Sequence, residues 1–394
     1  MSTFKTKSIY DYKILYIFAT LIFFRPGVVN FLSPTFDMIY KQATLGFVAL
    51  LIILCLLDRK HIKVISLLVV SFSVIIISTY MNNLNYEQVI YVFMGIVGFC
   101  IYCYLGINHN LKLFIKCSFY VLAVMIVINL ILFINNPDGL FITDYYGARY
   151  HFFGNKNNFL SYIFPELVFV VFALKLGIER KIILFSVALI SVITIVLSSS
   201  SSSILVVFFY LFFFYLDYKK DGINKLNYNR SIFIYLCLFF LIVIFRLQRL
   251  FSFIIEDILK KSLDFSNRTE IWDVAISMVA QKPFIGYGAD FENGVVRILN
   301  TYYYGHNLFL EIMLSGGVTS LFFFILAVNS VRKKVMKTNI KINSTIAWIT
   351  MSFSLATLTE AFFTTKPLYL LLMIAYCSNS IEKYITEHNS FYMT

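Results

Sequence analysis

The chain has 394 residues, of which 59% are hydrophobic and only 14% are charged, and its formal net charge is +12 at pH 7. A soluble protein of this length needs far more polar surface to cover its core, so the composition excludes a soluble domain of any size. The positive charge does not indicate a nucleic-acid partner, because the Lys and Arg residues lie in short segments between apolar blocks, as they do in membrane proteins.

Apolar blocks of roughly 17–25 residues recur along the chain, and this length crosses the hydrocarbon core of a bilayer. The pattern predicts an all-α, polytopic helical bundle with about twelve transmembrane helices, in a single integral membrane domain over 1–394. The expected helices cover 13–32, 38–57, 62–80, 87–106, 112–134, 157–176, 181–199, 202–217, 231–247, 305–330, 344–363 and 367–381. Six consecutive serines, Ser198 to Ser203, form either a tight turn or part of a helix, and about eleven spans is the alternative count.

The first twelve residues are polar and lack a small-residue cleavage site, so we expect no cleavable signal sequence. The six Cys residues lie in or at the ends of apolar segments. Cys100 and Cys103 have the spacing of a redox or metal pair, but inside a helix this spacing places two small residues on one face. No second pair completes a site, and we expect no disulfide framework.

The basic residues indicate the orientation in the membrane. With the N-terminus in the cytoplasm, most Lys and Arg residues fall in the short inner segments, so the positive-inside rule places both termini inside. Two long external loops then remain, 135–156 and 248–304. In the second loop Asn267 precedes apolar residues at helical spacing, and Pro283 ends the pattern, which predicts a short amphipathic helix over the outer face.

The residues that could carry chemistry lie in these loops. Arg268 falls in the first turn of the expected loop helix, where free backbone N–H groups and an Arg side chain together can hold a diphosphate. The alternative is that Arg268 pairs with Asp264 or with a lipid headgroup. His306 begins the tenth expected span, and a helix N-terminus favours the neutral imidazole, which can accept a proton from a sugar hydroxyl. The alternative is an interfacial His that only caps the helix.

Three further residues accompany these two. Asn307 and Glu311 are one helical turn apart and share a face. Glu311 is a candidate to bind acceptor hydroxyls or to orient Arg268, and a carboxylate that pairs for structure is the alternative. His151, beside Arg149 in the first external loop, is the competing candidate for the base. The chain has no Gly-rich phosphate loop and no nucleophile elbow, and five scattered His residues do not favour a metal site.

These segments resemble the O-antigen ligase and polysaccharide polymerase superfamily. The matching residues occur in the family's order and are Arg268, Trp272, Pro283, Gly286, Gly288, His306, Asn307, Gly316 and Gly317. A second match runs from Arg149 through Gly154 and Asn155 to Asn157, just before a span. The helix count, the long loop after the ninth span and the inner termini also agree. The resemblance is closest to a Wzy-type polymerase of O-antigen or capsule repeat units.

The resemblance implies a helical bundle of the lipid-dependent glycosyltransferase (GT-C) class in the bacterial inner membrane. It implies that undecaprenyl-diphosphate-linked oligosaccharides are polymerised on the outer side of that membrane, without a metal or another cofactor and with inversion at the anomeric carbon. His306 would be the catalytic base, and the substrate would contact Arg268, Arg149, Glu311, Asn307 and Asn155. The resemblance leaves open whether a chain-length regulator is a further partner.

Two alternatives to the polymerase remain. An O-antigen ligase would pass the finished chain to lipid A core, but ligase members carry an Arg where this chain has about Ser201. Arg149, Arg246 or Arg249 could supply that charge. A flippase or other transporter of the lipid-linked unit should show two related halves with broken helices and charges that line the bundle, and the sequence shows neither.

Overall fold

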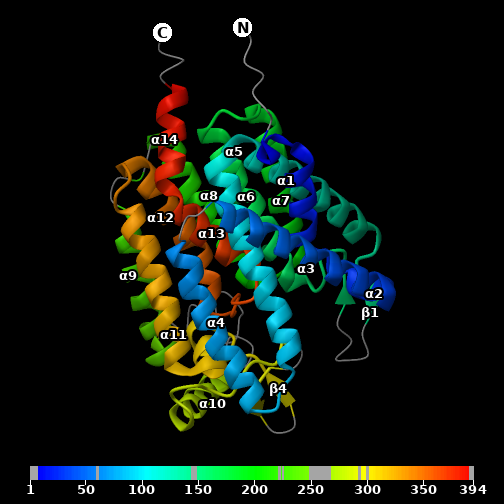
Figure 1. Ribbon diagram of the computed structural model, residues 1–394, viewed down its shortest axis with the longest axis vertical. Helices are drawn as coiled ribbons and strands as arrows, with labels where there is room; N and C mark the ends of the chain where they lie inside the picture. Colours follow the sequence, from blue (N-terminus) through cyan, green and yellow to red (C-terminus); the bar gives the residue numbers. More distant parts are fainter. Residues whose placement is uncertain are drawn as a thin grey trace, which may run out of the picture. The chain divides into compact units, whose positions relative to one another are not determined.

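The computed structural model describes residues 8–58, 62–142, 149–220, 223, 226–247, 268–291, 294–298 and 301–389. Helices make up most of this part of the chain (Figure 1). Their bounds are α1 Lys13–Phe23, α2 Val29–Leu32, α3 Pro34–Leu57, α4 Lys63–Met81, α5 Tyr86–Asn135, α6 Leu160–Lys175, α7 Lys181–Ser198, α8 Ser201–Lys220, α9 Tyr228–Leu238, α10 Arg268–Gln281, α11 Leu308–Val335, α12 Ile340–Thr357, α13 Lys366–Tyr376 and α14 Ser378–Asn389.

Short elements complete the described fold. The antiparallel pair β1 (Phe141–Ile142) and β2 (Arg149–Tyr150) places Phe141 opposite Tyr150. The pair β3 (Val296–Ile298) and β4 (Thr301–Tyr303) places Val296 opposite Tyr303. The 3₁₀ turns Ile9–Asp11 and Lys156–Asn158 precede α1 and α6, and a π-helical turn, Phe239–Ile244, follows α9.

Each apolar block predicted as a helix is helical over most of its length. Among the described residues, seven helices are long and apolar enough to cross a membrane. The chain is therefore a polytopic helical membrane protein, as predicted. The total of about twelve spans and the GT-C class stay predictions.

The structure differs from the prediction in the first helix. The first helix stops at Phe23 and resumes as α2, because Pro26 has no N–H to donate to a continuing helix. The fourth and fifth predicted spans are both helical and meet within α5 at a kink, where Asn110 has non-helical backbone angles (φ −150°, ψ 74°). The Asn110 side chain accepts a hydrogen bond from the backbone N–H of Leu113 (3.2 Å), so it caps the second half as an N-cap residue does.

The serine run is a turn with a helix end on each side. α7 ends at Ser198, Ser199 adopts the left-handed conformation (φ 55°), and α8 begins at Ser201. The Ser203 hydroxyl lies 3.1 Å from the Ser200 hydroxyl, which donates to Asn157 Oδ1 over the same distance. Short polar side chains thus satisfy one another where the chain reverses.

The chain divides into two compact units. The first comprises 1–60, 98–207 and 369–394, and the second comprises 61–97 and 208–368. The predicted single membrane domain stays a prediction. In the second unit α4 packs along α11, where the hydroxyls of Ser71 and Ser320 lie 2.8 Å apart and each donates to the other residue's carbonyl. Small polar residues of this kind hold helices together in the absence of water.

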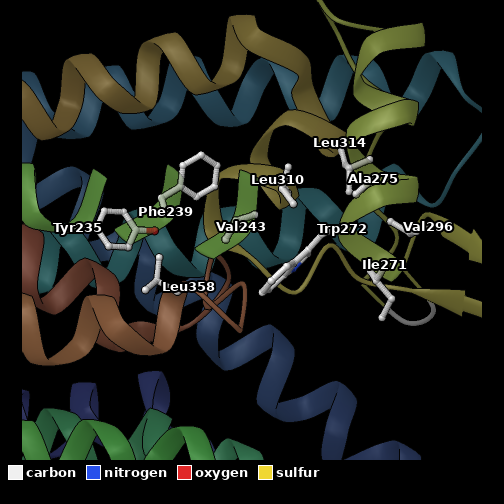
Figure 2. Close-up of a cluster of buried hydrophobic side chains, with 10 residues drawn as sticks. All are labelled: Tyr235, Phe239, Val243, Ile271, Trp272, Ala275, Val296, Leu310, Leu314 and Leu358. Carbon is white, nitrogen blue, oxygen red and sulfur yellow. The ribbon is translucent and has the colours of Figure 1, made fainter. Parts of the chain in front are cut away.

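The helix α10 confirms the amphipathic helix predicted for the second loop, although Asn267, its expected cap, lies outside the described residues. Its apolar face carries Ile271, the fully buried Trp272 and Ala275. Figure 2 shows this face within a cluster that also contains Leu310 and Leu314 of α11. The cluster therefore fixes α10 against the start of α11.

Candidate active site

The segment Pro283–Gly288 after α10 binds α11 through backbone atoms. The N–H of Tyr287 donates to the carbonyl of Leu314 (2.6 Å), and the N–H of Gly288 donates to that of Ser315 (3.1 Å). In return, the N–H of Val318 donates to the carbonyl of Pro283 (2.7 Å). These bonds are possible because α11 is interrupted at Gly316 and Gly317, which frees carbonyl and N–H groups that a continuous helix would use.

Two glycines of the predicted motifs are required by this contact. Gly317 has φ 63° and Gly286 has φ 66°, a region that L-residues with a Cβ rarely occupy. A Cβ on Gly317 would overlap the backbone of Phe284, and one on Gly286 would overlap the carbonyl of Leu314. Gly286 and Gly317 therefore allow the backbones of α11 and of the segment Pro283–Gly288 to come close together.

Asn307 is the N-cap of α11, so the helix begins two residues later than His306. Its Oδ1 accepts from the backbone N–H groups of Phe309 (3.0 Å) and Leu310 (3.1 Å). Its Nδ2 donates to the carbonyls of Thr357 (3.4 Å) and Leu358 (3.1 Å). The side chain is fully buried, and its two donors and two lone pairs are all used. These bonds give Asn307 a structural role at the start of α11, and its expected contact with the substrate stays a proposal.

Glu360 brings the two main candidates together. It lies between α12 and α13, and its Oε1 forms an ion pair with Arg268 Nη2. Its Oε2 lies 3.2 Å from Nδ1 of His306. One carboxylate thus bridges the first residue of α10 and the residue before the cap of α11. All three side chains are mostly buried but keep some exposure, 18% for Arg268 and Glu360 and 25% for His306.

The carboxylate of Glu360 determines which nitrogen of the neutral His306 imidazole carries the proton. Burial alone would raise the pKa of Glu360, but the hydrogen bond from His306 and the Arg268 charge outweigh it and hold that pKa below its ordinary value. An ionised carboxylate can only accept hydrogen bonds, so Nδ1 of His306 carries the proton. Nε2 is left with its lone pair, and it has no partner within the described part of the chain. A base held by a carboxylate in this way is the arrangement of a general-base dyad.

Backbone and aromatic contacts fix the position of His306. Its backbone adopts φ 43°, a strained value for a residue with a side chain. Its carbonyl accepts from Nε1 of the buried Trp272 (3.2 Å). The guanidinium of Arg246 lies 4.9 Å from the centroid of the Trp272 ring and donates to Asp273 (2.6 Å). Trp272, the aromatic residue of the predicted Arg–Trp motif, therefore helps to hold His306 in place through its backbone carbonyl.

Glu311 lies beside the same turn. Its Oε2 accepts from the backbone N–H of Gly305 at 2.6 Å, and the side chain is buried. This bond holds the residue that precedes His306 and favours the structural alternative. A contact between Glu311 and acceptor hydroxyls stays a proposal.

Arg149, His151 and Asn155 belong to the first unit. Arg149 pairs with Asp138 (2.8 Å), and both side chains are mostly exposed. His151 is buried near Phe133 and Phe159, and burial together with the charge of Arg149 lowers the pKa of His151. Asn155 caps the 3₁₀ turn before α6 by accepting from the N–H of Asn157 (3.2 Å). Substrate contacts of Arg149 and Asn155 stay proposals.

Glu360 was missed in the sequence because it falls inside an apolar stretch that predicts a helix over 344–363. A carboxylate in such a stretch is costly and is a functional-site candidate by default, and that signal could have identified it. Asp264 and Arg249, named above as alternatives, lie outside the described residues. Among the described residues no three His, Cys, Asp or Glu side chains gather as a metal site would require, and metal independence stays a prediction.

The fold and this site define a multi-pass membrane protein with a His–carboxylate–Arg cluster at the start of a late helix. Residues 186–325 match the model of the family described as O-antigen ligase. The match confirms the predicted resemblance to the O-antigen ligase and polysaccharide polymerase superfamily, whose members are glycosyltransferase-like membrane enzymes. The matched part contains Arg268 and His306, whereas Glu360 lies beyond it. Comparison with curated proteins gave no significant match.

Proposed function

We propose that the protein polymerises undecaprenyl-diphosphate-linked oligosaccharide repeat units on the outer face of the bacterial inner membrane. The observation that carries the proposal is the single carboxylate, Glu360, shared by Arg268 and His306. A glycosyl transfer from a lipid diphosphate needs a base for the incoming hydroxyl and a cation for the leaving group. This cluster supplies both within one small region.

The chemical step follows from the arrangement. Nε2 of His306 takes the proton of an acceptor hydroxyl on the incoming unit, and the oxygen attacks the anomeric carbon of the growing chain. The bond from that carbon to the phosphate oxygen breaks, and undecaprenyl diphosphate leaves with the electron pair. Attack opposite the leaving group inverts the anomeric carbon. Arg268 uses one N–H group on Glu360 and keeps the others for the diphosphate.

The family description favours a second candidate, an O-antigen ligase. Both reactions need the same base and the same cation, and they differ only in the acceptor. Ser201 at the first position of α8, where ligase members carry an Arg, supports the polymerase.

The acceptor that the protein uses distinguishes a polymerase from a ligase. Purified protein in liposomes, supplied with lipid-linked repeat units from cells that lack it, should produce a ladder of polymer, and His306→Ala should not. Transfer that occurs only after lipid A core is added would establish the ligase. If the protein forms no glycosidic bond with either acceptor, the proposed function is wrong.

The orientation is part of the proposal, since the substrates of such an enzyme are exposed outside the membrane. Ser277 on α10 should face outside, and Lys337 between α11 and α12 should face inside. Both residues are exposed, so single Cys replacements in a Cys-free variant can be labelled with an impermeant reagent in intact cells. Labelling at 337 but not at 277 would contradict the orientation.

A further inference from the structure

A cavity of about 510 Å³ lies in the second unit, apart from the dyad. It is bounded by the chain after α4 and by the segment that leads from α10 to β4. The rings of Tyr287 and Tyr302 line it together with the polar side chains of Asn82 and Asp290. Ligand sites commonly have this volume and this mixture of aromatic walls with a few polar groups.

The walls of the cavity are built before any ligand arrives. The N–H of Tyr287 is bonded to α11, and the N–H of Ala289 donates to the hydroxyl of Thr79 on α4 (3.0 Å). The Tyr287 ring also has Lys282 Nζ 4.6 Å from its centroid. Tyr302 stands opposite Arg297 in the β3–β4 pair, and that guanidinium lies 5.8 Å from its ring centroid. Each ring is therefore held by a neighbouring cation as well as by its backbone.

A second cavity of about 340 Å³ adjoins the first. The two share Asn82, whose Oδ1 accepts a hydrogen bond from Lys282 Nζ (2.7 Å). An ammonium group has three donors, so Lys282 keeps donors for a ligand in the smaller cavity. Phe284, with 71% of its surface exposed, also lines the smaller cavity. The two cavities thus meet at Asn82, and together they offer aromatic and polar side chains; we call the pair the path.

This lining fits a carbohydrate. A pyranose ring presents apolar C–H groups on its faces and hydroxyl groups around its rim. Tyr rings supply an apolar face with a polar tip, the carboxylate of Asp290 accepts from hydroxyls, and an ammonium donates to them. A polyprenyl tail carries no polar group, so it would cover the charged side chains of this lining without forming a hydrogen bond to any of them, which is unfavourable.

We propose that this path binds the oligosaccharide at a sugar residue other than the one that reacts. Tyr302 precedes His306 by only four residues, at most about 14 Å of extended chain. The Tyr304 ring between them lies 6.5 Å from the imidazole ring. A sugar on Tyr302 is thus placed to hold the same chain whose next residues reach His306. The assignment rests on the proposed function for the nature of the ligand.

The test is a direct binding measurement. The probe is the free repeat-unit oligosaccharide, released by mild acid from the lipid-linked units that accumulate in cells lacking the protein. Calorimetry on the purified protein should show about tenfold weaker binding for Tyr302→Ala. Tyr302→Phe keeps the ring and should bind within about twofold of wild type. The matched control is Tyr80→Ala, an exposed Tyr of α4 outside both cavities, and it should bind as wild type does.

The outcomes separate this proposal from the function. Equal binding by wild type and Tyr302→Ala would overturn the carbohydrate path even if both proteins polymerise. Loss of binding in Tyr80→Ala to the same extent as in Tyr302→Ala would also overturn it, because the effect would not belong to the cavity. Failure of wild type to form any glycosidic bond, with binding that still depends on Tyr302, would remove the proposed function and leave the path standing.

Discussion

Two regions of the chain carry an Arg, a His and an Asn in that order and use them in different ways. In the second unit, Arg268 and His306 meet on one carboxylate, and Asn307 caps the helix that follows. In the first unit, Arg149 pairs with an exposed Asp, His151 is buried near aromatic rings, and Asn155 caps a single 3₁₀ turn. Residue types alone do not distinguish the two regions. The difference is Glu360, which contacts both Arg268 and His306 in the second unit.

The two His residues give the largest expected contrast. His306→Ala should lower the polymerisation rate by about 10²–10⁴-fold, the usual contribution of a general base, while lipid-linked units accumulate. His151→Ala should keep most of the activity per folded molecule, because its ring is buried and unsupported by a carboxylate. Rates in liposomes with equal amounts of folded protein measure both. The reverse result would move the base to the first unit.

The two Arg residues give the next contrast. Arg268→Ala should lower the rate by about 10²–10³-fold, as the loss of one charge-stabilising donor does. Arg268→Lys should rescue poorly, because an ammonium cannot bind carboxylate and phosphate with a planar fork. Arg149→Ala should cost about tenfold or less, since its ion pair is exposed and screened by solvent. Normal-length polymer from Arg268→Ala would show that the diphosphate is held elsewhere.

Glu360→Gln tests the carboxylate itself, with an expected loss of about ten- to a thousandfold in rate. The lowered pKa of Glu360 keeps the carboxylate ionised at neutral pH, where it accepts the hydrogen bond from His306. A neutral amide stabilises less well the positive charge that His306 gains when it takes the proton of the acceptor hydroxyl, so the rate measured in liposomes should fall. A rate equal to that of wild type would mean that Glu360 does not assist His306 in the reaction.

The two Asn residues should differ in stability and give the smallest effect on the rate. Asn307→Ala removes a helix cap and leaves two carbonyls without their donor, which should cost about 2–4 kcal/mol. Asn155→Ala should cost about 1 kcal/mol or less, because the cap serves one partly exposed turn. Denaturant unfolding in detergent micelles measures the difference. Equal losses of unfolding free energy in the two variants would show that the burial of Asn307 does not increase its contribution to stability.

The sequence predicts the helices well, because apolar runs of bilayer length leave the backbone no other way to satisfy its hydrogen bonds. It also predicts α10, since Trp272 and its apolar neighbours recur at helical spacing. The sequence does not predict the break in α11, because Gly316 and Gly317 are also compatible with a continuous span. Only the structure shows the segment that binds them.

The candidate site is predicted only in part, for a physical reason. Arg268 and His306 are found because each lies at a helix start in a polar loop. Glu360 lies 92 residues from Arg268 and 54 from His306, so only tertiary folding joins them. The sequence also does not predict that all hydrogen-bonding groups of the Asn307 side chain are used, because two of its four partners are carbonyls at the end of α12.

The contact between Pro283–Gly288 and α11 has a consequence for how such a protein can diversify. The bonds that hold it join backbone atoms, and the side chains of Phe284 and Ile285 reach the surface, with 71% and 39% exposed. Substitutions at these two positions therefore change the chemistry offered to a ligand while the bonds that hold the segment to α11 remain. The side chains of this segment can therefore vary while its backbone stays in place, so ligand preference can change there without a change in the residues around His306.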